Sequence, residues 1–438
     1  MSVLDSAIAN VALPTIARHL SAAPAESIWV VNAYQLVIVV SLLPLAALGE
    51  IVGYRRVFQV GLILFTIASA GCTQVHSLPT LILARALQGF GAASIMSVNG
   101  ALVRYTYPSN ILGRGVGLNA LVVSVSAALG PTIAAGILAI GPWEWLFAIN
   151  VPIGIGTYFL GRVSLPETPS SGKFDLPSTI VNIITFGLGF TGIDVLTRGG
   201  NAWLGAGELA AAVTTGTILV LRSLKQEDPL VPVDLLKIRI FTLSVATSVT
   251  SFTAQMLTFV SLPFFLEGVL HRTQVETGLV MTPWPVASGI SAAIAGRLSD
   301  RLPAAILGSA GLAVLASGLL LLAFLPAHAT PFEVCWRMAL CGSGFGFFQS
   351  PNNRTMLSSA PLERSGAAAG MLATARLTGQ TAGATIAAIC FRVATHVEPV
   401  ALTLAAIFAA LAAVASLSRL AGQTPTTAID PRHIAAAP

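Results

Sequence analysis

The sequence predicts an all-α integral membrane protein. Of its 438 residues, 55% are hydrophobic and only 9% are charged, whereas soluble domains carry roughly 25% charged residues. Apolar runs of about 20 residues recur along the chain, and a helix of that length crosses a hydrocarbon core of about 30 Å. The runs show no extended alternation of apolar and polar residues, so a membrane β-barrel is not favoured.

Fourteen apolar spans are expected along the chain, with its longer polar connections at 164–177 and 222–240. Most of the spans are long enough to cross the bilayer as a helix. In chain order, the predicted spans are residues 2–17, 28–48, 57–75, 80–103, 115–140, 143–161, 178–197, 203–221, 241–266, 277–296, 304–325, 332–350, 365–391 and 398–418.

The distribution of Lys and Arg predicts which loops face the cytoplasm, because cytoplasmic loops carry an excess of both. With the N-terminus placed inside, only Arg18, Arg198, Arg272 and Arg392 fall in outside loops. We therefore expect a multi-pass protein of the bacterial inner membrane with both termini in the cytoplasm. The sixteen basic residues of the inside loops and tail are Arg55, Arg56, Arg104, Arg114, Arg162, Lys173, Arg222, Lys225, Lys237, Arg239, Arg297, Arg301, Arg354, Arg364, Arg419 and Arg432.

The second half of the chain repeats the first. Pro14 corresponds to Pro263 at an offset of 249 residues, and Gly130 corresponds to Gly383 at an offset of 253. Each half has six helices, which is an even number. Both halves therefore cross the membrane in the same sense, and the repeat is parallel. Among transporters this arrangement belongs to two-bundle folds that rock around a central site. The predicted domains are a six-helix bundle at 1–163, a linker with two extra helices at 164–240, a second six-helix bundle at 241–420 and a cytoplasmic tail at 421–438.

The first span is shorter than its repeat. Thirteen residues precede Pro14, whereas 22 residues separate Phe241 from Pro263. Either the true start of the chain lies upstream, or this copy has a truncated first span.

Several function classes are disfavoured. The net charge of +5 comes from basic residues scattered singly between spans, which is typical of membrane orientation rather than of nucleic-acid binding. The chain has no GxxxxGK[ST] motif, so we do not expect transport driven by its own ATP hydrolysis, and we expect no enzyme activity. Its cysteines have no metal-type spacing and lie in or beside apolar runs, so we expect no metal site. They are Cys72, Cys335, Cys341 and Cys390.

Four motifs together carry a resemblance to a known family. LDSAIANVALP runs from Leu4 to Pro14, and WEWLFAINVPIG runs from Trp143 to Gly154. The predicted fourth and fifth spans add two sets of residues, namely Arg85, Gln88, Gly89, Gly91 and Ala92, and Gly117, Gly130, Pro131 and Gly136. The chain resembles the major facilitator superfamily and, within it, the fourteen-helix drug:proton antiporters of the quaternary-ammonium and methyl-viologen type.

The resemblance implies that Asp5 and Arg85 take part in proton coupling. Burial in a bilayer favours the neutral form of a carboxyl, which lets Asp5 gain and lose a proton. For Asp5 the alternative is a carboxylate at the membrane surface. For Arg85 it is a structural ion pair or a guanidinium bonded to backbone carbonyls.

The fifth-span glycines and Pro131 form the antiporter motif of this family. Proline within a helix removes a hydrogen bond and bends the axis, and glycines allow a neighbouring helix to approach closely. A kink that serves packing and a kink that gates exchange both remain open. Ala384 stands at the repeat position of Pro131, which favours gating.

Two loops are expected to form a conformational latch on the cytoplasmic side. An acid beside arginines at a helix end can form a charge-assisted clasp in one conformation. The alternative is a passive topological anchor. The latch residues are Glu50, Arg55 and Arg56 in the first copy and Gly296, Asp300 and Arg301 in the second.

Other polar residues inside spans are candidates for a substrate cavity, although they can instead satisfy one another. They are Asn32, Tyr34, Gln35, Asn119, Gln255, Glu267 and Arg376. The expected function is export of amphipathic cationic drugs in exchange for protons, by a monomer that uses the proton gradient and no cofactor. The alternatives are a metabolite exporter or proton symporter of the same fold, and a membrane sensor or channel.

Overall fold

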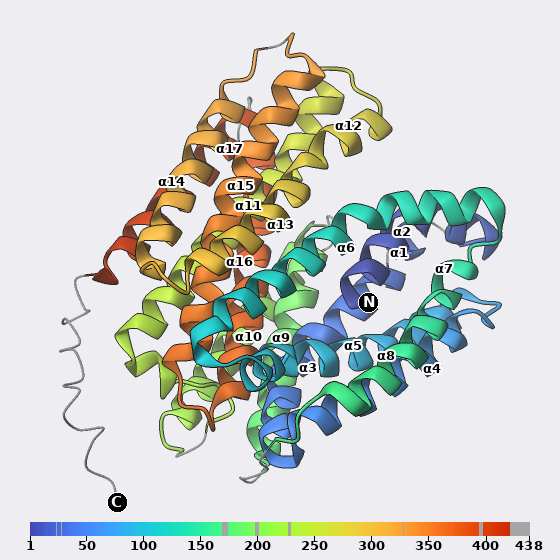
Figure 1. Ribbon diagram of the computed structural model, residues 1–438. Helices are drawn as coiled ribbons and strands as arrows, with labels where there is room; N and C mark the ends of the chain where they lie inside the picture. The colour runs from blue at the N-terminus through green and yellow to red at the C-terminus, as the bar shows by residue number, and fades with distance from the viewer. Residues whose placement is uncertain are drawn as a thin grey trace, which may run out of the picture.

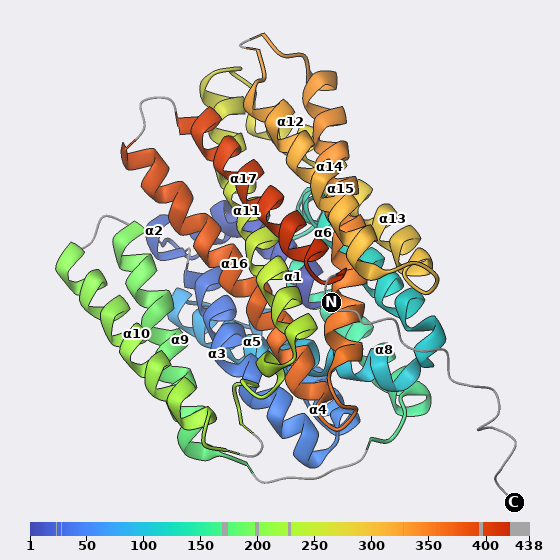
Figure 2. The same cartoon turned by 90° about the vertical axis from the view of Figure 1, so that its left-hand side faces the viewer.

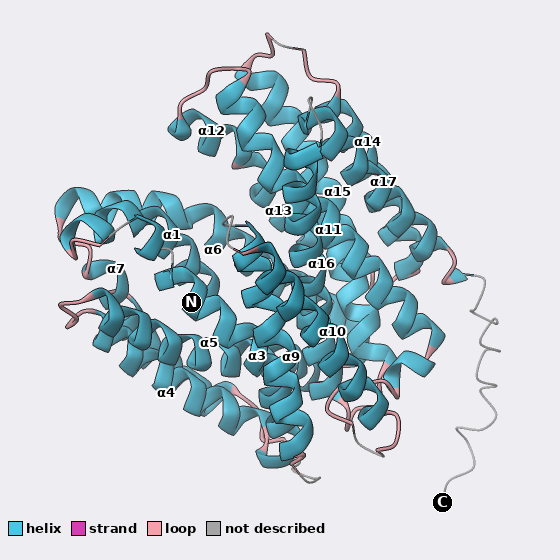
Figure 3. Ribbon diagram, turned by 180° about the vertical axis from the view of Figure 1, so that it is seen from behind, coloured by secondary structure: helices cyan, strands magenta, loops and turns pink. Residues whose placement is uncertain are grey.

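The computed structural model describes residues 1–22, 24–27, 29–168, 174–197, 201–226, 229–326, 328–393 and 397–420. Within these ranges the chain is helical and contains no strand (Figure 3). The protein is thus an all-helical membrane protein, as its composition predicts. The tail at 421–438 lies outside the described residues.

The first bundle is formed by the helices from α1 to α8. α3, α4 and α5 pack together, α4 contacts α8, and α1 packs along α6. The helices are α1 (Ser2–His19), α2 (Pro24–Ser27), α3 (Trp29–Val52), α4 (Tyr54–Cys72), α5 (Leu78–Thr106), α6 (Leu112–Ile140), α7 (Trp145–Ala148) and α8 (Asn150–Ser164).

The second bundle is formed by the helices from α11 to α17. α15 packs against α13 and α14, while α11 packs against α16 and α17 (Figure 2). The helices are α11 (Arg239–Gly268), α12 (Gln274–Met281), α13 (Pro283–Leu298), α14 (Ala304–Ala323), α15 (Pro331–Ser359), α16 (Ser365–Val393) and α17 (Val397–Leu417).

Two further helices, α9 (Leu176–Thr197) and α10 (Ala202–Ser223), pack against each other, and α9 also packs against α3. They stand at the edge of the molecule in Figure 2. The Asn32 side-chain amide donates to Asp194 Oδ1 at 3.1 Å, and the Asn182 amide donates to the carbonyl of Val40 at 2.9 Å. These two hydrogen bonds attach α9 to the first bundle.

Eleven segments of the described chain are long and apolar enough to cross a membrane. α1, α15 and α16 are not among them, although each lies where the sequence predicts a span. α15 is the clearest case, because it carries Arg337, Asn352 and Arg354 along a single helix. Two of these side chains are bonded inside the protein, Asn352 to Ser248 and Arg354 to Ser299. The count of fourteen crossings stays a prediction.

The first and second bundles contact each other towards one end of their helices. α6 crosses α13, and α16 packs against α3 and α5. A Cβ added at Gly117 would lie 2.8 Å from the carbonyl oxygen of Ala292, and one at Gly370 would lie 3.1 Å from Ala46 Cβ. We call the end that carries Glu50 and Asp300 the latch side, and these contacts lie towards it.

Farther from the latch side, the same helices make close contacts within their own bundles. On α6, Gly130 approaches Ala7 of α1, and on α16, Gly383 approaches Thr253 of α11. The ribbons of α1, α6 and α7 diverge here from those of α12 and α13 (Figures 1 and 3).

Candidate functional site

The centre of the candidate site is a buried ion pair inside the first bundle. α5 carries Arg85 and α1 carries Asp5 in its first turn. Arg85 Nη1 lies 2.5 Å from Asp5 Oδ2, and the two side chains are 0% and 1% exposed. The structure therefore brings together the two residues that the sequence proposes for proton coupling, and it places Asp5 in the protein interior rather than at the surface.

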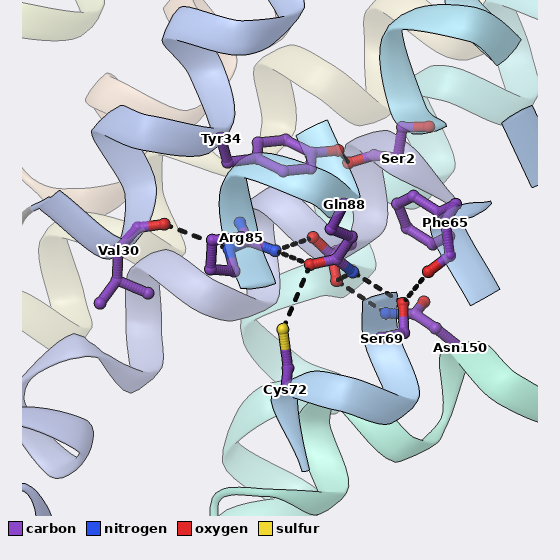
Figure 4. A network of polar contacts seen from close by, with 10 residues as sticks. Ser2, Val30, Tyr34, Phe65, Ser69, Cys72, Arg85, Gln88 and Asn150 are labelled. Carbon is purple, nitrogen blue, oxygen red and sulfur yellow. Dashed lines mark hydrogen bonds and ion pairs between the residues drawn. The ribbon is translucent and has the colours of Figure 1, made fainter. Parts of the chain in front are cut away.

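Polar side chains from α5 and α8 complete the hydrogen bonds of the Asp5 carboxylate. Gln88 Nε2 and Asn150 Nδ2 donate to Asp5 Oδ1 at 2.9 and 2.7 Å. Gln88 Nε2 also donates to Ser69 Oγ at 2.8 Å, and Gln88 Oε1 accepts from Arg85 Nη1 at 2.5 Å. α1, α5 and α8 thereby meet at the carboxylate, and Gln88 links α4 to this network through Ser69 (Figure 4).

The remaining contacts of Arg85 are backbone and aromatic. Its Nε donates to the carbonyl oxygen of Val30 at 3.1 Å. The guanidinium carbon lies 4.2 Å from the centroid of the Tyr34 ring and 5.4 Å from that of Phe147, and aromatic faces attract cations at such distances. Nη2 is buried and has no hydrogen-bond partner among the described residues. The arginine is thus held in place, but one of its donors remains unused.

A buried pair of this kind responds strongly to one proton. Removing one partner of a buried ion pair typically costs about 3 to 5 kcal/mol, because the other charge is left uncompensated. Protonating Asp5 would neutralise the carboxylate while Arg85 keeps its charge. One proton on Asp5 would therefore remove the charge attraction between the two side chains that join α1 to α5.

Sequence reasoning identified Asp5, Arg85 and Gln88 but missed Ser69 and Asn150. Asn150 is a polar residue in the apolar WEWLFAINVPIG stretch, and it is 1% exposed. An asparagine inside an apolar span is a usable signal, because burial requires a hydrogen-bond partner. Ser69 gives no such signal, because a serine in a span usually bonds its own helix, and its hydroxyl does donate to the carbonyl of Phe65 at 2.7 Å.

The two acids of the predicted latch each contact the start of a helix of the opposite bundle. Glu50 Oε1 accepts from the backbone N–H of Ala367 at 2.8 Å, and Glu50 Oε2 lies 3.2 Å from Arg364 Nη1. Asp300 Oδ1 accepts from the backbone N–H of Gly113 at 2.9 Å. Helix N-termini stabilise negative charge. The two acids therefore fasten α16 and α6 to the opposite bundle.

The predicted latch arginines lie elsewhere. Arg55 donates to the carbonyl of Arg162 and lies 3.6 Å from Glu167, while Arg56 and Arg301 are exposed. Gly296 lies at the α6–α13 crossing, where a Cβ would come within 2.5 Å of the carbonyl oxygen of Gly113. The arginines nearest the acids come from distant sequence, namely Arg364 beside Glu50, and Arg114 and Arg354 at 3.8 and 3.6 Å from Asp300.

Replacing Glu50 with Gln is expected to lower the transport rate by roughly tenfold. The change weakens a charge-assisted contact across the bundles, and such a hydrogen bond is worth roughly 1.5 to 3 kcal/mol. Initial rates in vesicles measure the effect, with Arg56→Gln as the matched control because Arg56 is exposed. Equal rates for both variants would show that the Glu50 contact is a passive anchor.

The antiporter-motif glycines serve different interfaces. Gly117 lies at the crossing with α13, and Gly130 lies against α1, where a Cβ would come within 2.4 Å of Ala7 Cβ. Gly136 has open space around it. α6 continues through position 131, and the side chain of Pro131 lies outside the described residues.

Three of the proposed cavity residues are used in contacts within the protein. Asn32 bonds Asp194, Tyr34 donates its hydroxyl proton to the carbonyl of Ser2 at 3.2 Å, and Asn119 accepts from Asn99 at 3.0 Å.

The remaining proposed cavity residues are Gln35, Gln255, Glu267 and Arg376. Gln35 is exposed, and Gln255 and Arg376 are half-buried. The Arg376 guanidinium carbon lies 5.7 Å from the ring centroid of Phe252. The side chain of Glu267 lies outside the described residues.

A family model described as the Major Facilitator Superfamily matches residues 1–384. The chain belongs to the major facilitator superfamily. Its fold agrees, because the solved structure of a double-tryptophan mutant of XylE superposes with a TM-score of 0.69 at 14% identity, covering 94% of this chain and 92% of that one. The protein is therefore a transporter of small molecules, as members of this superfamily are, and not an enzyme.

Curated relatives within the superfamily transport different compounds. The uncharacterized transporter YebQ of Escherichia coli is 52% identical over 94% of this chain and 91% of its own length. The riboflavin transporter RibZ of Clostridioides difficile is 33% identical over 86% and 82%. The multidrug resistance protein Stp of Mycobacterium tuberculosis is 29% identical over 87% and 72%. The family of the chain is thus established, whereas these relatives do not agree on a substrate.

Proposed function

We propose that the protein is a proton-coupled exporter of amphipathic organic compounds that works by alternating access across the cytoplasmic membrane. The observation that carries this proposal is the sealed Asp5–Arg85 pair, because one proton on the carboxylate would remove the charge attraction that holds the pair together. No other carboxylate among the described residues combines that degree of burial with a buried arginine partner.

The arrangement of the two bundles supports an outward-facing conformation, which is open to the outside and closed to the cytoplasm. The bundles are joined at the latch side, where Glu50 and Asp300 contact the opposite bundle. The same side carries the loops with most of the Lys and Arg residues, and such loops lie in the cytoplasm. The latch is therefore the closed cytoplasmic gate of an outward-facing transporter.

The coupling step then has a definite direction. In the outward-facing state Asp5 takes up a proton from outside, the Arg85–Asp5 pair loses its charge attraction, and bound compound is released. Reorientation exposes the neutral Asp5 to the cytoplasm, where the proton leaves and compound binds again. Proton and compound each shift the equilibrium only through a difference in affinity between the two states.

The substrate is an amphipathic, drug-like compound, as the relationship to Stp supports. Within this class of compounds, the sequence predicts quaternary-ammonium cations as substrates. A second candidate, transport of a flavin-like aromatic metabolite, is favoured by the identity to RibZ. The second bundle also contains an aromatic cluster. We define the aromatic cluster as Phe252, Phe259, Trp284 and Phe345, whose neighbouring ring centroids lie 5.2 to 6.2 Å apart.

Efflux from cells that lack their own exporters tests the proposal. Cells expressing the protein are loaded with ethidium or with riboflavin, and loss of each compound is followed with and without a protonophore. We expect protonophore-sensitive efflux of at least one compound. Efflux that persists after the proton gradient is collapsed would overturn the coupling, and no efflux of either compound would overturn the substrate assignment.

A further inference from the structure

Arg376 is a charged residue near the middle of a membrane helix that the coupling mechanism does not use. It is the twelfth residue of α16, roughly 16 Å along the axis from the latch-side end. Three and seven residues earlier on the same helical stripe stand Ala373, which packs against α3 and α5, and Ala369, which approaches Gly100 of α5. The stripe that bears Arg376 thus faces the first bundle.

The charge of Arg376 has no counter-ion among the described residues. Arg85, Arg354 and Arg364 each lie within 3.6 Å of a carboxylate. Arg376 forms neither an ion pair nor a hydrogen bond with a described residue, and its side chain is half-buried. A guanidinium at this depth is stabilised only by facing water or a ligand rather than lipid.

Aromatic side chains continue from this guanidinium into the second bundle, where Phe252, Phe345 and Trp284 are 4%, 2% and 1% exposed and Phe259 is partly exposed. Arg376 lies over Phe252, which meets Phe345 edge to face at 5.3 Å between centroids. Phe345 adjoins Trp284, whose indole nitrogen is buried and donates to no described residue. Buried donors are nearly always paired, so the cluster retains one unused donor in addition to the free guanidinium.

A polar residue of the first bundle lies on the facing helix. Gln35 of α3 is exposed and bonds no described residue. It precedes Leu43 and Ala46 on the same helical stripe, and those two residues contact Gly370 of α16 closer to the latch side. Gln35 and Arg376 are thus on facing stripes of α3 and α16, and Leu377, next to Arg376, still packs against the cluster that contains Tyr34.

We propose that Arg376 and the aromatic cluster form a subsite that anchors a planar aromatic compound through a carboxylate. A guanidinium recognises a carboxylate with two parallel hydrogen bonds, and Phe259, the partly exposed ring of the cluster, supplies apolar contact for the remainder of the compound. The inference rests on the proposed export of amphipathic compounds and narrows the substrate class to aromatic acids, opposite in charge to the cations that the sequence predicts.

Paired ligands that differ only in this group test the subsite. Binding of 9-anthracenecarboxylate and of anthracene-9-carboxamide to the purified full-length protein is measured by equilibrium dialysis in detergent, against protein-free micelles. We expect the carboxylate to bind at least tenfold more tightly than the amide. In Arg376→Gln that preference is lost while amide affinity stays unchanged, and Arg376→Lys retains part of it. Arg337→Gln is the matched control, because this half-buried arginine of α15 donates to the carbonyl of Glu333.

Each outcome decides the proposal. Equal binding of acid and amide by the parent, or no binding of either, would overturn it. An equal loss of affinity for both ligands in Arg376→Gln would also overturn the proposal, because that pattern indicates a structural role for Arg376. Binding needs no proton gradient, so a retained carboxylate preference without proton-coupled efflux would refute the proposed coupling while leaving the subsite in place.

Discussion

Replacing Asp5 with Asn is expected to abolish proton-coupled export. The substitution keeps the size of the side chain but removes its charge, and it leaves Arg85 buried without a carboxylate. Loss of one partner of a buried pair costs about 3 to 5 kcal/mol, and about 3 kcal/mol corresponds to a factor of roughly 100 in rate. Export by the variant, measured as initial rates in vesicles, is expected to fall at least about 100-fold and to lose its dependence on external pH.

Asn150→Ala separates the coupling role of Asp5 from simple loss of structure. It removes one hydrogen bond to the same carboxylate but leaves the ion pair in place. We expect this variant to retain pH-dependent export at a reduced rate. If Asp5→Asn kept the pH dependence of the parent, Asp5 would not carry the coupled proton.

Replacing Gly117 with Val is expected to open the latch side. The added Cβ would lie 2.8 Å from the carbonyl oxygen of Ala292 and 3.1 Å from the Cα of Gly296, and both are backbone atoms that cannot move independently. Overpacking of this kind costs about 1 to 3 kcal/mol, which shifts a two-state equilibrium by roughly 5- to 150-fold. The conformation with the bundles joined at α6 and α13 should lose population by that factor.

A cysteine reporter at the latch side measures this shift. Ala101 is 0% exposed in the cluster that joins the two bundles there, so Ala101→Cys, in a background without the native cysteines, reports opening by its rate of maleimide labelling. Gly136→Val is the matched control on the same helix, because Gly136 has open space around it. Faster labelling is expected only with Gly117→Val, and equal labelling of the two variants would contradict the role given to the crossing.

The helical fold follows from composition and from the spacing of apolar runs, because burial in lipid requires backbone groups to bond within helices or closed barrels. The resemblance implies a coupling role for Asp5 and for Arg85 separately, but it leaves open whether the two residues pair. The depth of Asp5 was left open by the short first span, and the distance to Arg85 resolves it.

The partners of the latch acids show what sequence alone leaves undetermined. Glu50 has Arg55 and Arg56 nearby in sequence, yet its ion-pair partner is Arg364, more than 300 residues away. Neighbouring charges on a helix end point in different directions, and the carboxylate satisfies a helix N-terminus of the other bundle. Cross-bundle contacts depend on how two separately folded bundles pack, which local patterns do not encode.

The most direct test of proton coupling is compound-driven proton movement in proteoliposomes. Purified protein is reconstituted with a trapped pH dye, and an exported compound is added on one side without an imposed gradient. We predict proton flux opposite to the flux of the compound, saturating with compound concentration and absent from Asp5→Asn. Saturable compound transport with no proton movement in the parent, or the same proton movement in the variant, would contradict the account.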